Sequence, residues 1–244
     1  DMAKVEGKVE ELKAFVESLA TSHPDAVRKA VAKMLGVNES AVDITDLKQI
    51  GLKGLILMLM KAGQGLSGAA LTLANLQQFD LAKPRQNAEE LKKMVQDLAK
   101  PGSGVTEAKV KAAVAKMLKV DASTVDLTTL AGMSSEEILI ALIANSQGLS
   151  GLVSSLMNFG AMNVRELASQ YEAAAKSTVE TAKNGVTRAE VEEYAKKVGV
   201  TDVDGQYASL VEAIVLEKLN KVYQTSFASL EAFVKGSFAF FVLN

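Results

Sequence analysis

One segment of the chain occurs twice, and this repeat limits the possible folds more than any other feature. Residues 27–47 (VRKAVAKMLGVNESAVDITDL) return 83 positions later as residues 110–130 (VKAAVAKMLKVDASTVDLTTL), with 13 of 21 positions identical. The motif QGLSG at 64–68 returns at 147–151 with the same offset. Identity this dense at a fixed offset indicates an internal duplication of a unit of about 80 residues.

A weaker third copy follows the first two. VTRAEV at 186–191 echoes VTEAKV at 105–110, and an apolar stretch at 208–238 stands where the other copies have theirs. We therefore predict an all-α protein whose duplicated multi-helix unit, with a divergent third copy, packs as a helical bundle or array. The expected divisions are residues 1–100 for repeat 1, 101–178 for repeat 2, and 179–244 for repeat 3 with a Phe-rich C-terminal tail.

The apolar positions in each unit have helical spacing. In residues 6–19 they recur every three or four positions, which predicts an amphipathic helix. Asp25 is the expected N-cap of the following helix. Ser134 or Ser135 is expected to cap a later helix, whose first turn begins at Glu136. Only three prolines occur in 244 residues, which suits long helices, and no stretch alternates with the period of a strand.

Composition excludes several classes of function. A net charge of −2 favours neither nucleic acid nor an anionic membrane surface as a partner. The chain has no cysteine and one histidine, His23, so we predict no transition-metal site. The loop carboxylates Asp43, Asp46 and Asp126 have no nucleophile or base near them in sequence, and we predict that the protein is not an enzyme.

Two nearly uncharged stretches are the most unusual segments. Residues 138–164 carry no charged side chain, and residues 55–79 carry only Lys61. Either is long enough to cross a bilayer, yet glycine, serine and asparagine interrupt both. We therefore expect each to form a pair of buried helices joined near the QGLSG motif, and not a membrane span.

These stretches also supply the expected ligand contacts. Their small residues allow close helix packing or line a slot, and methionine adapts to irregular apolar shapes. If an apolar molecule such as a lipid or pigment is bound between the helices, the expected contacts are Met58, Met60, Leu66, Leu142, Leu149 and Met157. The composition does not identify a cofactor.

The C-terminal tail is rich in phenylalanine. Five of the eight phenylalanines lie in residues 227–241. A tail of this kind would promote nonspecific association if it were exposed to water. We therefore expect that it either folds back onto the core or inserts into a partner protein. The candidate partner-binding residues are Phe233, Phe238, Phe240 and Phe241.

Residues 27–60 resemble an acyl carrier protein. The shared features are a helix, a Leu-Gly-Val step at 35–37, a loop that ends in Ile-Gly-Leu at 50–52, and an apolar helix after it. The family attaches its prosthetic group to the serine of an Asp-Ser-Leu triplet, where this chain has Lys53-Gly54-Leu55. The resemblance therefore implies an apolar slot between helices without the attachment chemistry, and we treat it as an analogy.

The sequence thus favours a non-enzymatic helical protein that buries an apolar small molecule. The alternative is a structural or accessory subunit that docks on a larger assembly through its apolar helices and tail. The chain begins at Asp1, which suits a processed mature chain of a secreted or organelle-lumen compartment and equally an artificial start. The sequence does not determine the oligomeric state.

Overall fold

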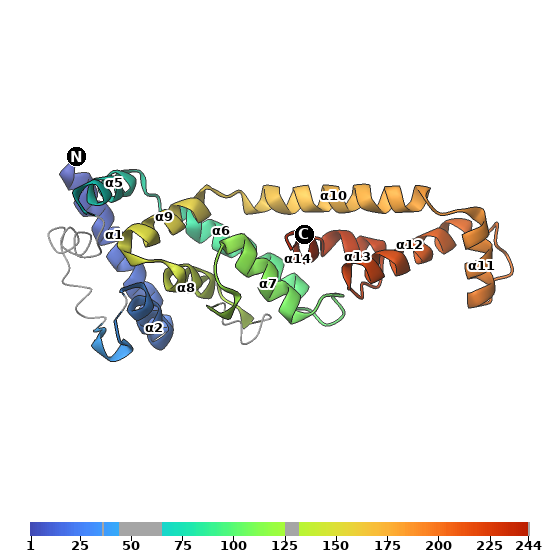
Figure 1. Ribbon diagram of the computed structural model, residues 1–244, viewed down its shortest axis with the longest axis horizontal. Helices are drawn as coiled ribbons and strands as arrows, with labels where there is room; N and C mark the ends of the chain where they lie inside the picture. The colour runs from blue at the N-terminus through green and yellow to red at the C-terminus, as the bar shows by residue number, and fades with distance from the viewer. Residues whose placement is uncertain (36, 44–64, 125–131, 244) are drawn as a thin grey trace. The chain divides into compact units, whose positions relative to one another are not determined.

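The computed structural model describes residues 1–35, 37–43, 65–124 and 132–243 (Figure 1). These residues form 12 α-helices and two short 3₁₀ helices, with no strand among them. The prediction of an all-α protein is therefore confirmed.

The chain divides into two compact units. Unit 1 comprises Asp1–Lys93 and Leu118–Asn163, and unit 2 comprises Met94–Met117 and Val164–Asn244. The elements of unit 1 are α1 (Met2–Ser22), α2 (Pro24–Leu35), α5 (Gly65–Gln78), most of α6 (Ala82–Leu98), α8 (Ser135–Asn145), α9 (Gly148–Ala161) and the 3₁₀ helices Glu39–Ala41 and Ala122–Thr124. The elements of unit 2 are the end of α6, α7 (Glu107–Leu118), α10 (Val164–Asn184), α11 (Arg188–Val198), α12 (Tyr207–Tyr223), α13 (Leu230–Lys235) and α14 (Phe238–Phe241).

The bounds of several helices keep the offset of the sequence repeat. Helix α7 begins 83 residues after α2, and both have 12 residues. Helix α9 begins 83 residues after α5, and both have 14 residues. The repeat as a packing unit, and its divisions near residues 100 and 178, stay predictions.

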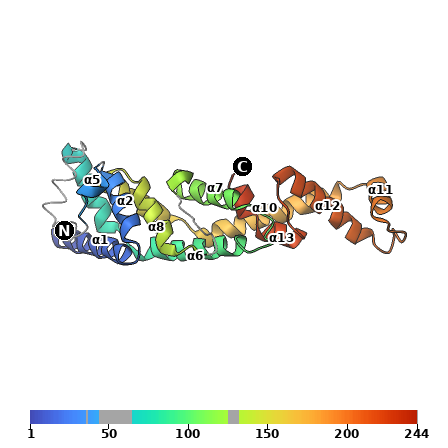
Figure 2. The same ribbon diagram turned by 90° about the horizontal axis from the view of Figure 1, so that it is seen from below.

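In unit 1 the first helix confirms the amphipathic helix predicted from the apolar spacing of residues 6–19. Helix α1 buries its apolar stripe, including Phe15 and Leu19, and packs against α2 and α5 (Figure 2). Helix α2 begins at Pro24, so the predicted N-cap at Asp25 is wrong and Asp25 lies in the first turn. Proline is favoured at that first position because its missing N–H would have no helical partner.

Helix α8 is the central helix of unit 1. It packs against α2 and α9, and six consecutive residues from Ile138 to Ile143 are buried. Ser134 caps it: its hydroxyl accepts from the Glu137 N–H at 3.3 Å, while the Glu137 carboxylate accepts from the Ser134 N–H at 3.0 Å. The uncharged stretch is divided at Ser146 and Gln147. No described helix is both long and apolar enough to cross a membrane.

In unit 2 the helices after α10 return along it. Both α12 and α13 pack against α10, and α11 packs against α12 (Figure 1). Thr187 caps α11 with a reciprocal pair of hydrogen bonds to Glu190, and Gly199 ends it in the left-handed conformation at φ +78°. This arrangement brings the C-terminal tail back onto α10.

Candidate functional site

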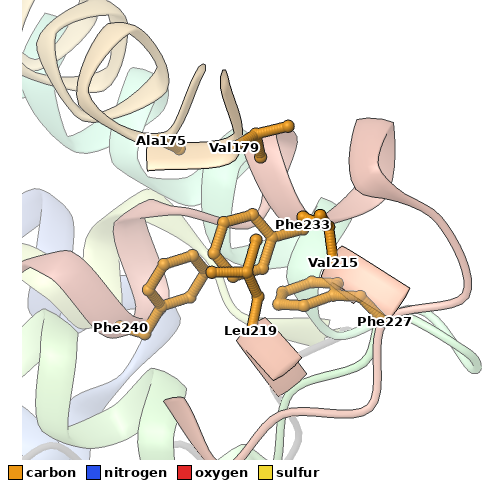
Figure 3. Packing of buried hydrophobic residues seen from close by; sticks show 7 residues of the cluster. All are labelled: Ala175, Val179, Val215, Leu219, Phe227, Phe233 and Phe240. Atoms are coloured by element: carbon orange, nitrogen blue, oxygen red, sulfur yellow. The ribbon is translucent and has the colours of Figure 1, made fainter. Parts of the chain in front are cut away.

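The phenylalanines of the tail are packed inside unit 2. Phe233, Phe238 and Phe240 are at most 2% exposed, and Phe241 is half-buried. Figure 3 shows the tail cluster, which we define as Phe227, Phe233 and Phe240 together with Ala175 and Val179 of α10 and Val215 and Leu219 of α12. Within this chain the tail therefore folds back onto the core.

The rings of the tail cluster contact one another in favourable geometries. The centroids of Phe233 and Phe240 are 4.7 Å apart, and Phe227 meets Phe233 edge-on at 5.7 Å. Tyr223, at the end of α12, adds a ring 4.9 Å from Phe240. Such pairs contribute about 0.5–1.5 kcal/mol each beyond the area they bury, so the cluster gives the tail a defined position.

Phe227 is fixed by its backbone and by two glycines. Asn220 donates to the Phe227 carbonyl at 2.9 Å and accepts from the Phe227 N–H at 3.0 Å. A Cβ atom at Gly104 would lie 2.6 Å from the Phe227 backbone, and a Cβ at Gly236 would lie 2.5 Å from Cζ of the ring. Neither approach tolerates a side chain.

A cavity of about 560 Å³ lies beside the tail within unit 2. We call it the tail cavity. Its apolar lining comes from Met94 and Leu98 at the end of α6, Ala168 of α10, Ala232 of α13 and Phe238 of α14. The remaining lining residues are Asp97, Ser103, Glu172, Lys235, Gly236 and Ser237. Three segments that are distant in sequence thus form one site, whose lining is partly apolar and partly polar.

The charged groups of the tail cavity lie at its solvent-exposed rim. The side chains of Asp97 and Lys235 are 71% and 70% exposed, and each forms an ion pair with a residue of its own segment, Lys100 and Glu231 respectively. The hydrogen bond to Glu231 is the main cause that raises the pKa of Lys235. Glu172 is a part-buried residue that forms no ion pair among the described residues, and its negative charge also helps to raise the pKa of Lys235.

Ser237 is the most deeply buried polar residue of this lining, at 1% exposure. Its backbone N–H donates to Val234 at 3.2 Å, and its carbonyl accepts from Phe240 and Phe241 at 3.2 and 2.8 Å. Its hydroxyl has no hydrogen-bond partner in the described part of the chain. An unpaired buried hydroxyl costs about 1–3 kcal/mol, so such groups normally have a partner.

Of the residues predicted to contact an apolar ligand, the described Leu66, Leu142 and Met157 do not line this cavity. Leu142 is buried in α8 at 2% exposure, Leu66 of α5 is 76% exposed, and Met157 of α9 is part-buried. Met58, Met60 and the side chain of Leu149 lie outside the described residues. These six contacts stay predictions.

The four phenylalanines predicted to bind a partner lie together at the end of unit 2. Phe233 and Phe240 are in the tail cluster, Phe238 lines the tail cavity and lies 6.4 Å from the ring of Tyr171, and Phe241 contacts Tyr223. In this conformation their contacts are intramolecular. Partner binding by these rings stays a prediction.

Lys109 closes the end of α12 at a second, smaller cavity of about 400 Å³. Its ammonium donates to the carbonyls of Tyr223 and Gln224, the latter at 2.7 Å, and burial lowers the pKa of the lysine. Gln224 has a left-handed backbone at φ +53°, so the helix does not continue past it. These carbonyls therefore lack the backbone N–H donors that a further helical turn would supply. The interaction has the geometry of a helix cap, and we assign it a structural role.

A shallow groove between α11 and α12 is crossed by ion pairs. Lys218 donates to Glu190 at 2.7 Å, and Lys197 lies 3.3 Å from Glu217. The hydrogen bond from Lys218, followed by the one from the Thr187 backbone, lowers the pKa of Glu190 to about 2. Positive and negative groups alternate across the groove, so it presents no single charge to a ligand.

The polar groups that sequence singled out do not converge on a reactive site. The predicted loop histidine, His23, lies 3.3 Å from the carboxylate of Glu136, and its side chain is 27% exposed. In the described part of the chain, no group of three acidic or histidine side chains could hold a metal ion. Asp46 and Asp126 lie outside the described residues.

Sequence reasoning did not identify the tail cavity. Met94 and Leu98 were recognisable as apolar positions of an amphipathic helix, but nothing local distinguishes Ala168, Ala232 or Ser237 from ordinary packing positions. Comparison of the chain with protein-family models, with curated proteins and with solved structures finds no match. The case for a function therefore depends on the geometry of the cavity.

Proposed function

We propose that the protein is a non-enzymatic binding protein for a small apolar molecule, which occupies the tail cavity of unit 2. The observation that carries the proposal is the cavity itself. Its volume of about 560 Å³ falls within the range of about 300–1,000 Å³ that is usual for small-molecule sites, and apolar side chains from three segments form part of its walls. Burial of an apolar ligand there would be favoured by about 25 cal/mol per Å² of surface removed from water.

The distribution of polar groups supports a binding role. Asp97 and Lys235 are exposed to solvent at the entrance of the cavity, and each already forms an ion pair. These two residues therefore add no unpaired charge to the apolar part of the lining. No nucleophile–base pair is found among the residues that line the cavity. The site can hold and shield a molecule, and we propose no reaction for it.

A binding titration tests this proposal. Nile red is an uncharged apolar dye whose emission rises in apolar surroundings, and we expect the full chain to bind it with saturation. Ala168→Leu narrows the cavity from α10 and is expected to weaken binding at least tenfold. Ala173→Leu adds the same group to an exposed position of α10 and is expected to leave the affinity unchanged.

Two outcomes would refute the proposal. One is the absence of saturable binding to the unmodified chain. The other is equal binding by Ala168→Leu and Ala173→Leu, because the dye would then bind elsewhere. The near-UV circular dichroism of the tyrosines, all four of which are in unit 2, checks that each variant is folded.

Docking onto a larger assembly through the tail is the less favoured function. The rings of Phe233 and Phe240 would have to leave the tail cluster to reach a partner. Removal of one buried phenylalanine from a core costs about 3–5 kcal/mol, and a partner would have to replace that contact for each ring. The docking function therefore requires a second conformation of the tail, whereas ligand binding uses the conformation described.

A further inference from the structure

The tail cavity has one polar feature that a purely apolar ligand would leave unsatisfied. Ser237 lines the cavity, and its hydroxyl is the side-chain atom that lacks a hydrogen-bond partner in the described residues. Its backbone N–H and carbonyl are both used within the tail, so the hydroxyl alone is available. Rotation about a single side-chain bond moves a serine hydroxyl between three positions. In the conformation described the hydroxyl has less than 1 Å² of accessible surface, so a ligand group at the wall reaches it only after such a rotation.

The charges of the same lining limit which ligand group fits. Glu172 contributes a carboxylate that forms no ion pair among the described residues, although its charge is one of the causes that raise the pKa of Lys235, and Asp97 adds a second negative group. Lys235 is the one lysine of the lining, and it is already held by Glu231 at 2.6 Å. A carboxylate ligand would face two like charges with no free cation to pair with it. The lining thus favours a group that accepts from a hydroxyl and donates to a carboxylate.

We propose that the ligand of the tail cavity is an apolar alcohol, whose hydroxyl accepts a hydrogen bond from Ser237 and donates one to Glu172. A hydroxyl has one donor and two acceptor positions, so it can satisfy both groups at once. The hydrocarbon body occupies the wall formed by Met94, Leu98 and Phe238. This inference rests on the proposed function and names the chemical class of its ligand.

The test compares four probes that differ only in their polar group. These are 2-naphthalenemethanol, 2-ethylnaphthalene, 2-naphthoate and 2-naphthylmethylamine, each measured by displacement of Nile red from the full chain. A neutral hydrogen bond contributes about 0.5–1.5 kcal/mol, so the alcohol should bind about three- to tenfold more tightly than the hydrocarbon. The carboxylate should bind more weakly than either of them.

Variants assign the difference to the named residues. Ser237→Ala is expected to reduce the advantage of the alcohol, because only its hydrogen bond to Glu172 remains, while the hydrocarbon binds as before. Ser226→Ala, at an exposed position before Phe227, should change neither affinity. Glu172→Gln lies at a part-buried position of α10 and should improve the binding of 2-naphthoate. It therefore provides a readout that does not depend on the folding of the serine variant.

The failure of this inference differs from the failure of the proposed function. If the alcohol and the hydrocarbon bind equally, or the amine or the carboxylate binds most tightly, the ligand class is wrong and the binding function stands. If Ser237→Ala retains the full preference for the alcohol, the assignment to Ser237 is wrong. If Nile red and all four probes fail to bind the unmodified chain, the proposed function itself is wrong.

Discussion

Gly236 is a position in unit 2 where one added methyl group should have a large steric effect without backbone strain. Its φ of −85° is accessible to alanine, so Gly236→Ala introduces no unfavourable backbone conformation. The new Cβ would lie 2.5 Å from Cζ of Phe227, whereas carbon atoms prefer separations of about 3.5–4.0 Å. The ring of Phe227 must therefore move by about 1 Å.

The surroundings of Phe227 leave little room for that movement. The ring centroids of Phe233 and Phe240 lie 5.7 and 5.8 Å from that of Phe227. The side chain of Asn220 is hydrogen-bonded to both the N–H and the carbonyl of Phe227. Overpacking of a closed core costs about 1–3 kcal/mol. For a unit of roughly 100 residues each kcal/mol lowers the melting temperature by about 4–8 °C, so we expect a decrease of about 4–24 °C.

Tyrosine signals measure the unfolding of this unit separately. The chain has no tryptophan, and all four tyrosines lie in unit 2, with Tyr223 in contact with Phe233 at 5.6 Å. Gly185→Ala is the matched control, because its Cβ would lie 3.6 Å from its nearest neighbours, an ordinary contact. We expect that control to melt within a few degrees of the unmodified chain.

A double-mutant cycle checks that the ring is the cause. In a Phe227→Leu background the shorter side chain no longer reaches the position of the new methyl group, so Gly236→Ala should cost much less there. The reasoning is refuted if Gly236→Ala melts like Gly185→Ala, or if its effect is as large with leucine at position 227 as with phenylalanine.

Three further substitutions test other parts of the structure. Gly104→Ala should destabilise unit 2 far more than Gly102→Ala. Both glycines have φ near +82°, but only at Gly104 would the added Cβ collide with a neighbour. Equal tyrosine melting curves for the two variants would contradict this prediction. The pKa of Glu190 is about 2 in the folded protein against an ordinary value of 4.5, so its stabilising effect is complete above pH 4.5 and is lost as the pH falls toward 2. Glu190→Gln should therefore melt below the unmodified chain at pH 7 and converge with it near pH 2, as followed by tyrosine melting. Asn87→Asp should lower the free energy of unfolding by about 1–3 kcal/mol, because the Asn87 amide donates to two carbonyls at the end of α9 at 2.7 and 2.6 Å and a carboxylate cannot donate. Hydrogen exchange of the backbone amides in α9 should become faster in this variant. The control Gln86→Glu, at an exposed position, should leave that exchange unchanged.

Local patterns predicted the local structure well. The three-to-four spacing of residues 6–19 predicted α1, and the Ser-x-x-Glu pattern at 134–137 predicted the cap of α8. Both signals act within one helical turn, so the surrounding fold does not change them. Asp25 failed as a cap because the proline before it already fixes the φ angle of a first helical residue.

The tail cavity could not be predicted in this way. Its walls come from the end of α6, from α10 and from α13 and α14, and which of these segments meet is decided by tertiary packing. The same applies to Ser237, because a serine at the N-cap of a short helix is usually hydrated or bonded to the first turn of that helix. Only the fold shows that its hydroxyl is buried without a partner. Sequence also left the fate of the phenylalanines open, since hydrophobicity alone favours burial in the chain and burial in a partner equally.

The two glycines beside Phe227 show why the tail has a definite position. Hydrophobic collapse is not directional and would accept many arrangements of five phenylalanines. The close approach of Phe227 to Gly104 and Gly236 is possible only because both positions lack a side chain, and these positions come from segments far apart in sequence. Gly104 also has a φ of +83°, which few other residues adopt. Steric fit therefore selects one arrangement of the tail. Since Gly236 also lines the tail cavity, this part of its wall is already in place before any ligand binds. Under the proposed function, a ligand would therefore bind without first ordering this part of the tail, which would leave more of the apolar burial to appear as affinity.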